Sequence, residues 1–338
     1  MSQRSPSPLR VLQSVPRIRP TTNPYNVQLI TALLQHDDVE LQYLSFRRWL
    51  LGRYDVFHVH WPEAIFSSHR RSGRAARRLL TALCLMRTRI TRTPLVRTWH
   101  NTERPSGISR LDHLLLDEFD RQTTVVLRLN ETTVVPLEVP VFTAPLGHYR
   151  DWYAGMPRRN RVPGRAAFVG LIRRYKGVEE LISAFRGVSS SSASLAVTGR
   201  PSTPALEASV RELSAGDPRI TLHFGFVDQP QFVVRVTEAE VIVLPFRHMH
   251  NSSTALAALS LDRPVLVPDN EVNRALAAEV GDGWIYTYSD TITSETLEAV
   301  LERVRNDVRS ASPRLDRRGW DESAAIHIEA FRRAAAHH

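Results

Sequence analysis

The stretch FVGLIRRYKGVEELISAF, residues 168–185, decides the fold class of this chain. Its apolar start predicts a buried strand, and the residues after Gly177 have the spacing of a helix. The loop between these elements holds three cations, namely Arg173, Arg174 and the chain's only lysine, Lys176. A strand end, a cationic loop and a helix N-terminus together predict a site for an anion such as phosphate. The alternative is the solvated basic loop of an ordinary α/β protein.

The same alternation of strands and helices extends outward from this stretch in both directions. On the N-terminal side, the pattern predicts strands at 10–15, 39–46, 55–61, 94–100, 123–129 and 139–145, and helices at 26–36, 67–90 and 109–120. On the C-terminal side, it predicts strands at 166–171, 194–199, 220–226, 241–246 and 264–269, and helices at 176–188, 204–213, 229–236, 252–261, 273–280, 293–308 and 320–336. Two such arrays predict two Rossmann-like domains with parallel sheets.

A stretch rich in Pro, Gly and Arg at 150–165 separates the two arrays, and its composition is typical of a linker. We therefore expect an N-terminal domain over 10–150, a C-terminal domain over 165–318 and a final helix within 319–338. Ligands of such sheets bind beyond the carboxyl ends of the strands. We expect the site in the cleft where the two domains face each other.

The composition narrows the classes of function. The single cysteine, Cys84, excludes an intramolecular disulfide and a cysteine-based metal cluster, and it predicts a cytosolic protein. No uncharged apolar run reaches the ~18–20 residues of a membrane span. The net charge of +9 favours an anionic partner, which could be nucleic acid, an anionic membrane or a phosphorylated small molecule. Because no nucleic-acid-binding module is recognisable, we expect no nucleic acid partner.

A second stretch, LPFRHMHNSSTALAALSLDRPVLVPD at 244–269, has the same strand–loop–helix pattern. Asn251, Ser252 and Ser253 precede an Ala- and Leu-rich helix, and residues of these types are preferred helix caps. Amides and hydroxyls at a helix start can hold a phosphate or a ribose. An ordinary capped helix is the alternative. Two histidines in the loop have no third ligand nearby, so they carry only a weak signal for zinc.

Together these two stretches resemble the C-terminal domain of glycosyltransferases of the GT-B fold. DVFHVHWPE at 55–63 and VRTWHN at 96–101 resemble bacterial transferases that build exopolysaccharides and glycolipids. These include GDP-mannose-dependent enzymes such as the xanthan β-mannosyltransferase group. The resemblance covers about 10–335. It implies two Rossmann-like domains that face each other across a cleft, with a last helix that crosses back to the N-terminal domain.

The resemblance implies a transferase that moves a hexose from a nucleotide diphosphate sugar to a lipid-linked or saccharide acceptor. GDP-mannose is the first donor to test and UDP-glucose the second. The implied diphosphate-binding residues are Arg173, Arg174, Lys176, Ser252 and Ser253. The implied contacts to the donor nucleotide and ribose are Gly170, Gly199, Arg200 and Asn251. The N-terminal domain would bind the acceptor, with Asn23, Tyr25 and Asn101 as candidates.

The chain departs from the family pattern in two places. Many retaining members carry two glutamates where Met249 and Ala257 stand here. The Gly-rich loop after the first strand is replaced by PRIRPTTNPY at 16–25. Both changes argue against a retaining mechanism copied from that group.

An inverting transferase needs a base on the acceptor side of the cleft. Glu63 and His100 follow the ends of two predicted strands, and the family has a histidine near the transferred sugar. We therefore predict that His100 contacts the sugar and that Glu63 acts as the base. The alternatives are a hydrogen-bonded strand-end histidine and an exposed loop glutamate. Because no Asp-x-Asp ends a strand, we expect no metal; cations and helix N-termini would neutralise the leaving diphosphate.

The stretch SHRRSGRAARRLLTALCLMRTRITR at 68–92 holds nine basic residues and no acidic one. Leu79, Leu80, Leu83 and Met86 lie at helical spacing. A basic amphipathic helix of this kind can lie on an anionic membrane, where each cation contributes about 1 kcal/mol. With a lipid-linked acceptor, this predicts a cytoplasmic protein peripheral to the inner face of the plasma membrane. A core helix with a solvated basic face is the alternative.

Two other functions are compatible with the same fold. A non-catalytic scaffold that binds a nucleotide would explain the two missing glutamates. A nucleotide-sugar epimerase would need carboxylates and histidines that converge on one site. Turnover of a nucleotide sugar, with and without an acceptor, separates these functions from a transferase.

Overall fold

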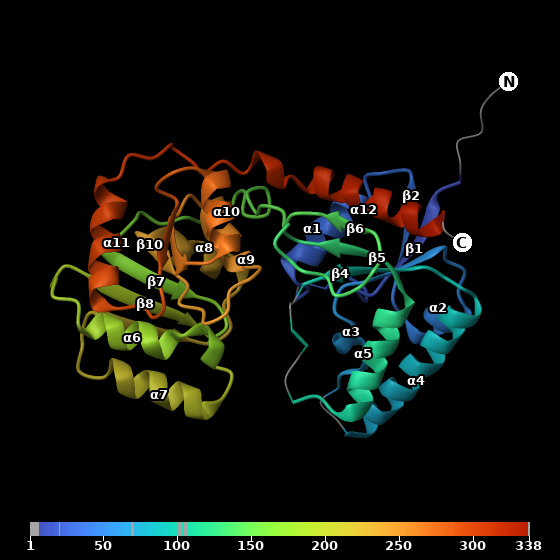
Figure 1. Cartoon of the computed structure of the whole chain (residues 1–338). Helices are drawn as coiled ribbons and strands as arrows, with labels where there is room; N and C mark the ends of the chain where they lie inside the picture. The colour runs from blue at the N-terminus through green and yellow to red at the C-terminus, as the bar shows by residue number, and fades with distance from the viewer. Residues whose placement is uncertain (1–6, 20, 69–70, 101–102, 105–106, 337–338) are drawn as a thin grey trace. The chain divides into compact units, whose positions relative to one another are not determined.

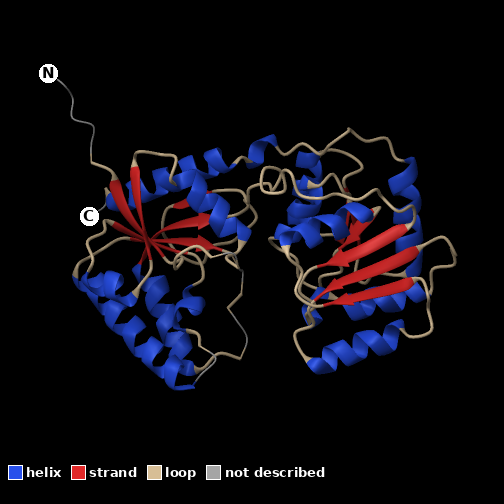
Figure 2. Ribbon diagram, turned by 180° about the vertical axis from the view of Figure 1, so that it is seen from behind, coloured by secondary structure: helices blue, strands red, loops and turns tan. Residues whose placement is uncertain are grey.

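The structure is a computed structural model that describes residues 7–19, 21–68, 71–100, 103–104 and 107–336. It forms two compact units, each continuous in space (Figure 1). Unit 1 contains Met1–Gly147 and Arg318–His338, and unit 2 contains His148–Arg317. Each unit holds one parallel sheet with helices on both of its faces (Figure 2). The prediction of an α/β fold with two Rossmann-like domains is confirmed.

The described strands of unit 1 form one six-stranded sheet in the order β2-β1-β3-β4-β5-β6. These strands are β1 (Leu9–Gln13), β2 (Val39–Tyr43), β3 (Val56–Val59), β4 (Leu95–Trp99), β5 (Thr123–Arg128) and β6 (Val141–Thr143). Every pair is parallel, with Val11 opposite Val56 and Phe57 opposite Leu95. Residues of the central strands are buried on both faces, which explains why these strands read as near-continuous apolar runs.

The described helices of unit 1 are α1 (Pro24–Leu33), α2 (Phe46–Leu51), α3 (Pro62–Phe66), α4 (Arg71–Ile90), α5 (Arg110–Gln122) and α12 (Trp320–Ala335). Although α12 follows unit 2 in the sequence, it packs on α1 and on the strands β3, β4, β5 and β6. Below the other face, α2, α3, α4 and α5 enclose a core around Trp49, Phe57 and Phe119.

Unit 2 repeats the design with the sheet order β12-β11-β10-β7-β8-β9. Its described strands are β7 (Arg165–Val169), β8 (Ser194–Gly199), β9 (Ile220–Phe224), β10 (Val241–Val243), β11 (Val265–Pro268) and β12 (Ile285–Tyr288). Its described helices are α6 (Val178–Arg186), α7 (Pro204–Ser214), α8 (Gln229–Glu238), α9 (Ser253–Ser260), α10 (Glu271–Val280) and α11 (Ser294–Asn306), with short 3-10 turns η1 (Arg174–Lys176) and η2 (Asp316–Arg318).

The sequence pattern missed three elements. Helices α2 and α3 have six and five residues, too few for a helical period to be visible in the sequence. Strand β12 buries only alternate residues, Tyr286 and Tyr288 among them, and has no continuous apolar run. The strand expected to continue to residue 46 ends at Tyr43, because Ser45 caps α2 through the Arg48 amide.

The segment expected as a linker at 150–165 packs as part of unit 2. The Arg150 guanidinium donates to the Pro313 carbonyl at 2.8 Å, and the Trp152 indole donates to Gln229 at 3.1 Å. Because these polar groups find partners within unit 2, the chain passes between the units at Gly147 and His148 instead.

Within unit 2, the backbone of Gly199 lies close against that of Gly170, and a substitution can test this contact. Gly199 has φ of +152°, and an added Cβ would stand 1.8 Å from the Gly170 carbonyl oxygen. Gly225 has a similar φ of +143°, but an added Cβ meets nothing within 4 Å. Gly199→Ala should therefore lower the free energy of unfolding by more than the ~1–3 kcal/mol typical of backbone strain alone. Gly225→Ala should cost only that strain. Urea denaturation of both variants measures the difference, and equal losses would contradict the contact.

Candidate active site

The carboxyl ends of β3 and β4 lie side by side in unit 1 and frame a small cavity of about 50 Å³. Its lining includes Trp61, Glu63, Arg97, His100 and Glu103. The structure therefore brings together the two residues predicted to be catalytic, Glu63 and His100, from strands far apart in the sequence.

The ring of His100 is held between two aromatic neighbours. It stacks on Trp61 with ring centroids 3.9 Å apart and planes 16° from parallel, and its Nε2 lies 3.2 Å from His60 Nδ1. Burial, with His327 and Arg97 nearby, lowers the pKa of His100 to about 3. The ring is therefore neutral at physiological pH, so it offers a hydrogen bond to a sugar hydroxyl and no positive charge.

His60 determines which nitrogen of His100 carries the hydrogen. One hydrogen lies between His60 Nδ1 and His100 Nε2. His60 Nε2 is buried and has no hydrogen-bond partner among the described residues. Because an orphaned buried N–H is rarer than an orphaned acceptor, this favours a hydrogen on His60 Nδ1 that is donated to His100. The hydrogen of His100 then sits on Nδ1.

His58 packs within the core of unit 1. It is fully buried, and its ring nitrogens lie 2.9 Å from Gln13 Oε1 and 2.8 Å from Thr98 Oγ1.

Glu63 lies in the first turn of α3, and not in an exposed loop as the alternative interpretation held. Pro62 starts this helix, and its fixed φ suits the first helical position. Burial raises the pKa of the Glu63 carboxyl, while the nearby Arg97 cation opposes that rise. Arg97 is itself paired with Asp120, and its guanidinium lies 4.2 Å from the centroid of the Trp99 ring. A half-buried carboxyl with a raised pKa is suited to general base chemistry.

The other acceptor-side candidates have structural partners. The Asn23 side-chain oxygen, Oδ1, accepts from the Tyr25 backbone N–H at 3.0 Å and caps α1. Tyr25 is buried, and its ring packs edge-on against those of His60, His100 and Trp320. Tyr25 therefore supports the rings around the cavity. Asn101 lies outside the described residues.

The cationic loop of unit 2 comprises Arg173, Arg174 and Lys176, and Lys176 is the last residue of η1. The Lys176 amine lies 5.0 Å from the Phe246 ring centroid and 6.0 Å from that of Phe168. An added Cβ on Gly170 would stand 3.7 Å from the same amine. Burial and the charge of Arg173 lower the pKa of Lys176 to about 8. Gly177 must be glycine, because its φ is +65° and a Cβ would stand 2.0 Å from the Pro245 carbonyl oxygen.

The remaining donor-side candidates follow the ends of β7, β8 and β10 along the chain. Arg173, Arg174 and Arg200 are exposed. The Ser252 hydroxyl caps α9 by accepting from the Ala255 amide at 3.2 Å, and Ser253 is the first residue of that helix. Asn251 precedes this cap.

Met249 and Ala257, which stand where many retaining enzymes carry glutamates, are 8% and 4% exposed. The Met249 backbone carbonyl accepts from the Asn270 side-chain amide, Nδ2, at 2.9 Å. Both positions are thus packed as apolar core, and neither offers a carboxylate to a ligand.

Unit 2 contains a cavity that was not predicted from the sequence. It measures about 330 Å³ and lies beyond the ends of β8 and β9, where its lining includes Thr198, Phe224, Phe226, Gln231 and Arg235. Gly225, with its positive φ directly after β9, was the signal that could have located it. Apolar walls with a few polar groups suit a flat heterocycle.

None of the helices in the described part of the chain is both long and apolar enough to span a membrane. Among the same residues, no three or more His, Cys, Asp or Glu side chains are grouped so that they could hold a metal ion.

Solved structures show the fold class. The Anabaena protein HepE, solved in complex with UDP, matches with a TM-score of 0.58 at 12% identity over 96% of this chain and 95% of its own. A UDP-forming α,α-trehalose-phosphate synthase from Burkholderia vietnamiensis matches with a TM-score of 0.61 at 13% identity over 98% and 100%. These matches show that the chain has the GT-B fold, as the sequence predicted.

The sequence comparison is more specific. No family model matches the chain. A GDP-mannose:glycolipid 4-β-D-mannosyltransferase from Xanthomonas campestris pv. campestris is 40% identical over 325 residues, 96% of this chain and 92% of the relative. The chain belongs to the family of these mannosyltransferases.

The buried imidazoles make stability depend on pH. Burial lowers the pKa of His100 to about 3 and that of His327 to about 4, whereas an unfolded chain binds these protons near 6.5. Between pH 6.5 and about 4 the unfolded state therefore holds more protons. The free energy of unfolding should therefore decrease as the pH is lowered through this range. The slope should approach ~1.4 kcal/mol per pH unit for each ring.

Urea denaturation between pH 7.5 and 5 measures this slope. The His327 Nδ1 hydrogen is donated to the Ser323 carbonyl at 2.6 Å, and an asparagine amide can replace that donor. His327→Asn should make the slope smaller by the contribution of one ring. An unchanged slope would show that His327 titrates alike in both states.

Proposed function

We propose that this protein transfers mannose from GDP-mannose to a glycolipid and forms a β-linkage to a 4-hydroxyl of the acceptor. The observation that carries this proposal is the 40% identity, over 96% of the chain, to an enzyme of that description. The cationic loop around Lys176 and the cavity around Glu63 would serve as the two kinds of site that such a reaction needs.

The linkage determines the mechanism. The sugar of GDP-mannose is α-linked, so a β product requires inversion at the anomeric carbon. Inversion in one step needs a base and no carboxylate beneath the sugar, which agrees with the packed Met249 and Ala257. Glu63 would take the proton of the acceptor hydroxyl while its oxygen attacks the anomeric carbon. The bond to the diphosphate breaks at the same time, and GDP leaves with the electron pair.

Unit 2 would hold the donor. The diphosphate would be neutralised by Lys176, Arg173 and Arg174. The starts of α6 and α9 would contribute as well, and Ser252 and Ser253 lie at the start of α9. Gly170, Gly199, Arg200 and Asn251 would contact the nucleotide and ribose. The cavity beyond β8 and β9 offers a place for the guanine. In unit 1, the neutral ring of His100 would hydrogen-bond the transferred sugar.

A transfer assay with GDP-mannose and a glycolipid acceptor tests the function, with UDP-glucose in parallel. We expect GDP release that depends on acceptor, and a β-anomeric product by NMR. GDP binding without turnover would indicate a scaffold, and conversion of GDP-mannose without acceptor would indicate an epimerase.

Glu63→Gln should lower kcat by about 10²–10⁴ and leave the Kd for GDP nearly unchanged, because it removes a base and no donor contact. Glu103→Gln is the matched control, since Glu103 lines the same cavity. If Glu63→Gln turns over like this control, Glu63 is not the base.

We also propose that α4 contacts an anionic membrane. Its outward face carries Leu79, Leu83, Met86 and Ile90, which are 63%, 38%, 54% and 74% exposed. The core instead receives Cys84 and Leu85 of this helix. An exposed apolar stripe flanked by arginines suits the interface between lipid headgroups and acyl chains.

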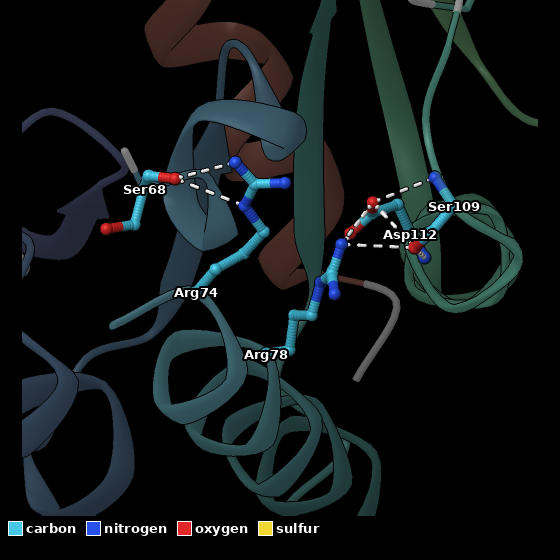
Figure 3. Close-up of polar contacts among 5 residues, drawn as sticks. All are labelled: Ser68, Arg74, Arg78, Ser109 and Asp112. Atoms are coloured by element: carbon cyan, nitrogen blue, oxygen red, sulfur yellow. Dashed lines mark hydrogen bonds and ion pairs between the residues drawn. The ribbon is translucent and has the colours of Figure 1, made fainter. Parts of the chain in front are cut away.

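The arginines of α4 differ in whether an ion pair neutralises their charge. Arg78 is paired with Asp112 at 2.6 Å, and Asp112 also forms the capping box of α5 with Ser109 (Figure 3). Arg74 donates to the Ser68 carbonyl at 3.0 and 3.1 Å, and so keeps a net positive charge (Figure 3). Arg74, Arg77 and Arg89 of this helix are exposed, and of these Arg89 also lies 3.8 Å from the Glu118 carboxylate.

Flotation with liposomes tests this contact. The protein should float with anionic vesicles and much less with neutral ones, and 1 M salt should release it because the screening length falls to ~3 Å. Leu79→Gln with Ile90→Gln should weaken flotation, whereas Val308→Gln, an exposed apolar position of unit 2, should not. Equal flotation with both lipids would contradict the proposal.

A further inference from the structure

The cavity beyond β8 and β9 has the features of a site for a flat ligand with a polar edge. Thr198, which lines it, is only 4% exposed, and its buried hydroxyl has no hydrogen-bond partner among the described residues. A buried hydroxyl without a partner costs free energy of folding. Phe226 also lines the cavity, and its ring is 76% exposed. A heterocyclic base would give the hydroxyl a partner and cover the ring by stacking.

Arg235 of α8 is the only permanently charged side chain among the described residues that line this cavity. Its Nη1 donates to Glu238 Oε2 at 3.3 Å. Within the described part of the chain, its Nε and Nη2 groups donate no hydrogen bond. These two groups form the edge of a guanidinium that presents two parallel N–H donors. Arg235 therefore keeps a bidentate donor edge for a ligand.

Two parallel donors match one edge of guanine better than any edge of adenine or uracil. Guanine presents two adjacent acceptors, O6 and N7, whereas adenine presents N7 beside an amino donor. Uracil has a single acceptor, O4, in the corresponding place. The opposite edge of guanine carries donors that a carboxylate would accept, but no Asp or Glu is among the described residues that line the cavity. The lining therefore favours O6 and N7 as the atoms that are recognised.

We propose that Arg235 makes the donor site specific for guanine nucleotides by donating two parallel hydrogen bonds to O6 and N7 of the base. This inference rests on the proposed function, in which the cavity holds the guanine of GDP-mannose. Arg235 rejects adenine because the amino group of that base would face the guanidinium donors. It rejects uracil because one of its two donors would lose water without gaining an acceptor.

Nucleoside diphosphates are the probes, and isothermal titration calorimetry on the full chain measures each Kd. GDP and IDP share O6 and N7, and IDP lacks only the 2-amino group. Their Kd values should therefore lie within about threefold of each other, whereas ADP and UDP should bind at least about tenfold more weakly. If IDP binds as weakly as ADP, the edge with the 2-amino group is recognised instead, and the proposal is overturned.

Arg235→Lys keeps the positive charge but cannot donate two parallel hydrogen bonds. It should raise the Kd for GDP about 10- to 100-fold and change the Kd for UDP less than about threefold. Arg211→Lys is the matched control, because Arg211 of α7 lies 4.6 Å from the centroid of the Phe224 ring and pairs with Glu207. The control should leave both Kd values unchanged. Equal losses for GDP and UDP in Arg235→Lys would overturn the proposal.

7-Deaza-GDP tests the contact at a single atom, because it lacks the N7 acceptor. The unchanged protein should bind it about tenfold more weakly than GDP. Arg235→Lys should bind the two ligands nearly equally, since the partner of N7 is already gone. This is the non-additivity expected of two groups in contact. If the losses from the substitution and from the missing N7 simply add, the direct contact is refuted.

These measurements separate the inference from the proposed function. If the protein prefers GDP to UDP and Arg235→Lys retains that preference, recognition by Arg235 fails and the donor assignment stands. If the protein binds no guanine nucleotide, or binds UDP more tightly than GDP, the proposed donor is wrong and the inference fails with it.

Discussion

Parallel strand pairing is the constraint on which the rest of this structure depends. Every strand pair described in either unit is parallel. A parallel pair cannot be closed by a tight turn, so a crossover returns the chain and all carboxyl ends meet at one edge of the sheet. For this reason Glu63 and His100 line one cavity, and Lys176 stands at the end of β7 beside Gly170.

The two units differ in the charge that their side chains present at these sheet edges. Unit 1 keeps the imidazoles of His100 and His327 neutral by burial, and pairs its half-buried cation Arg97 with Asp120. Unit 2 leaves Arg173 and Arg174 exposed and places the Lys176 ammonium over the rings of Phe246 and Phe168. A neutral surface suits sugar hydroxyls, which are recognised by hydrogen bonds. A concentrated positive charge suits a leaving diphosphate.

The sequence was most informative where burial imposes a pattern. Runs such as those of β3 and β7 are apolar because both faces of the sheet are covered, so the strands and the long helices could be predicted. Short or one-sided elements such as α2, α3 and β12 leave too few positions for a period to emerge. The placement of Glu63 beside His100 followed from topology. The partners of His100, namely Trp61 and His60, did not, because ring stacking and tautomer choice depend on side-chain geometry that no spacing encodes.

The position of α12 has a consequence for the order in which the protein matures. Unit 2 is one uninterrupted segment, whereas unit 1 needs the residues after Arg318 to cover its sheet. Phe331 and His327 of α12 pack on His58, beneath the ring cluster that includes His100. A ribosome therefore synthesises the strands of unit 1 first but adds their last covering helix only after unit 2 has been made. Unit 1 is begun before unit 2 but completed after it. Unit 2 can therefore finish folding before α12 covers the histidine cluster of unit 1.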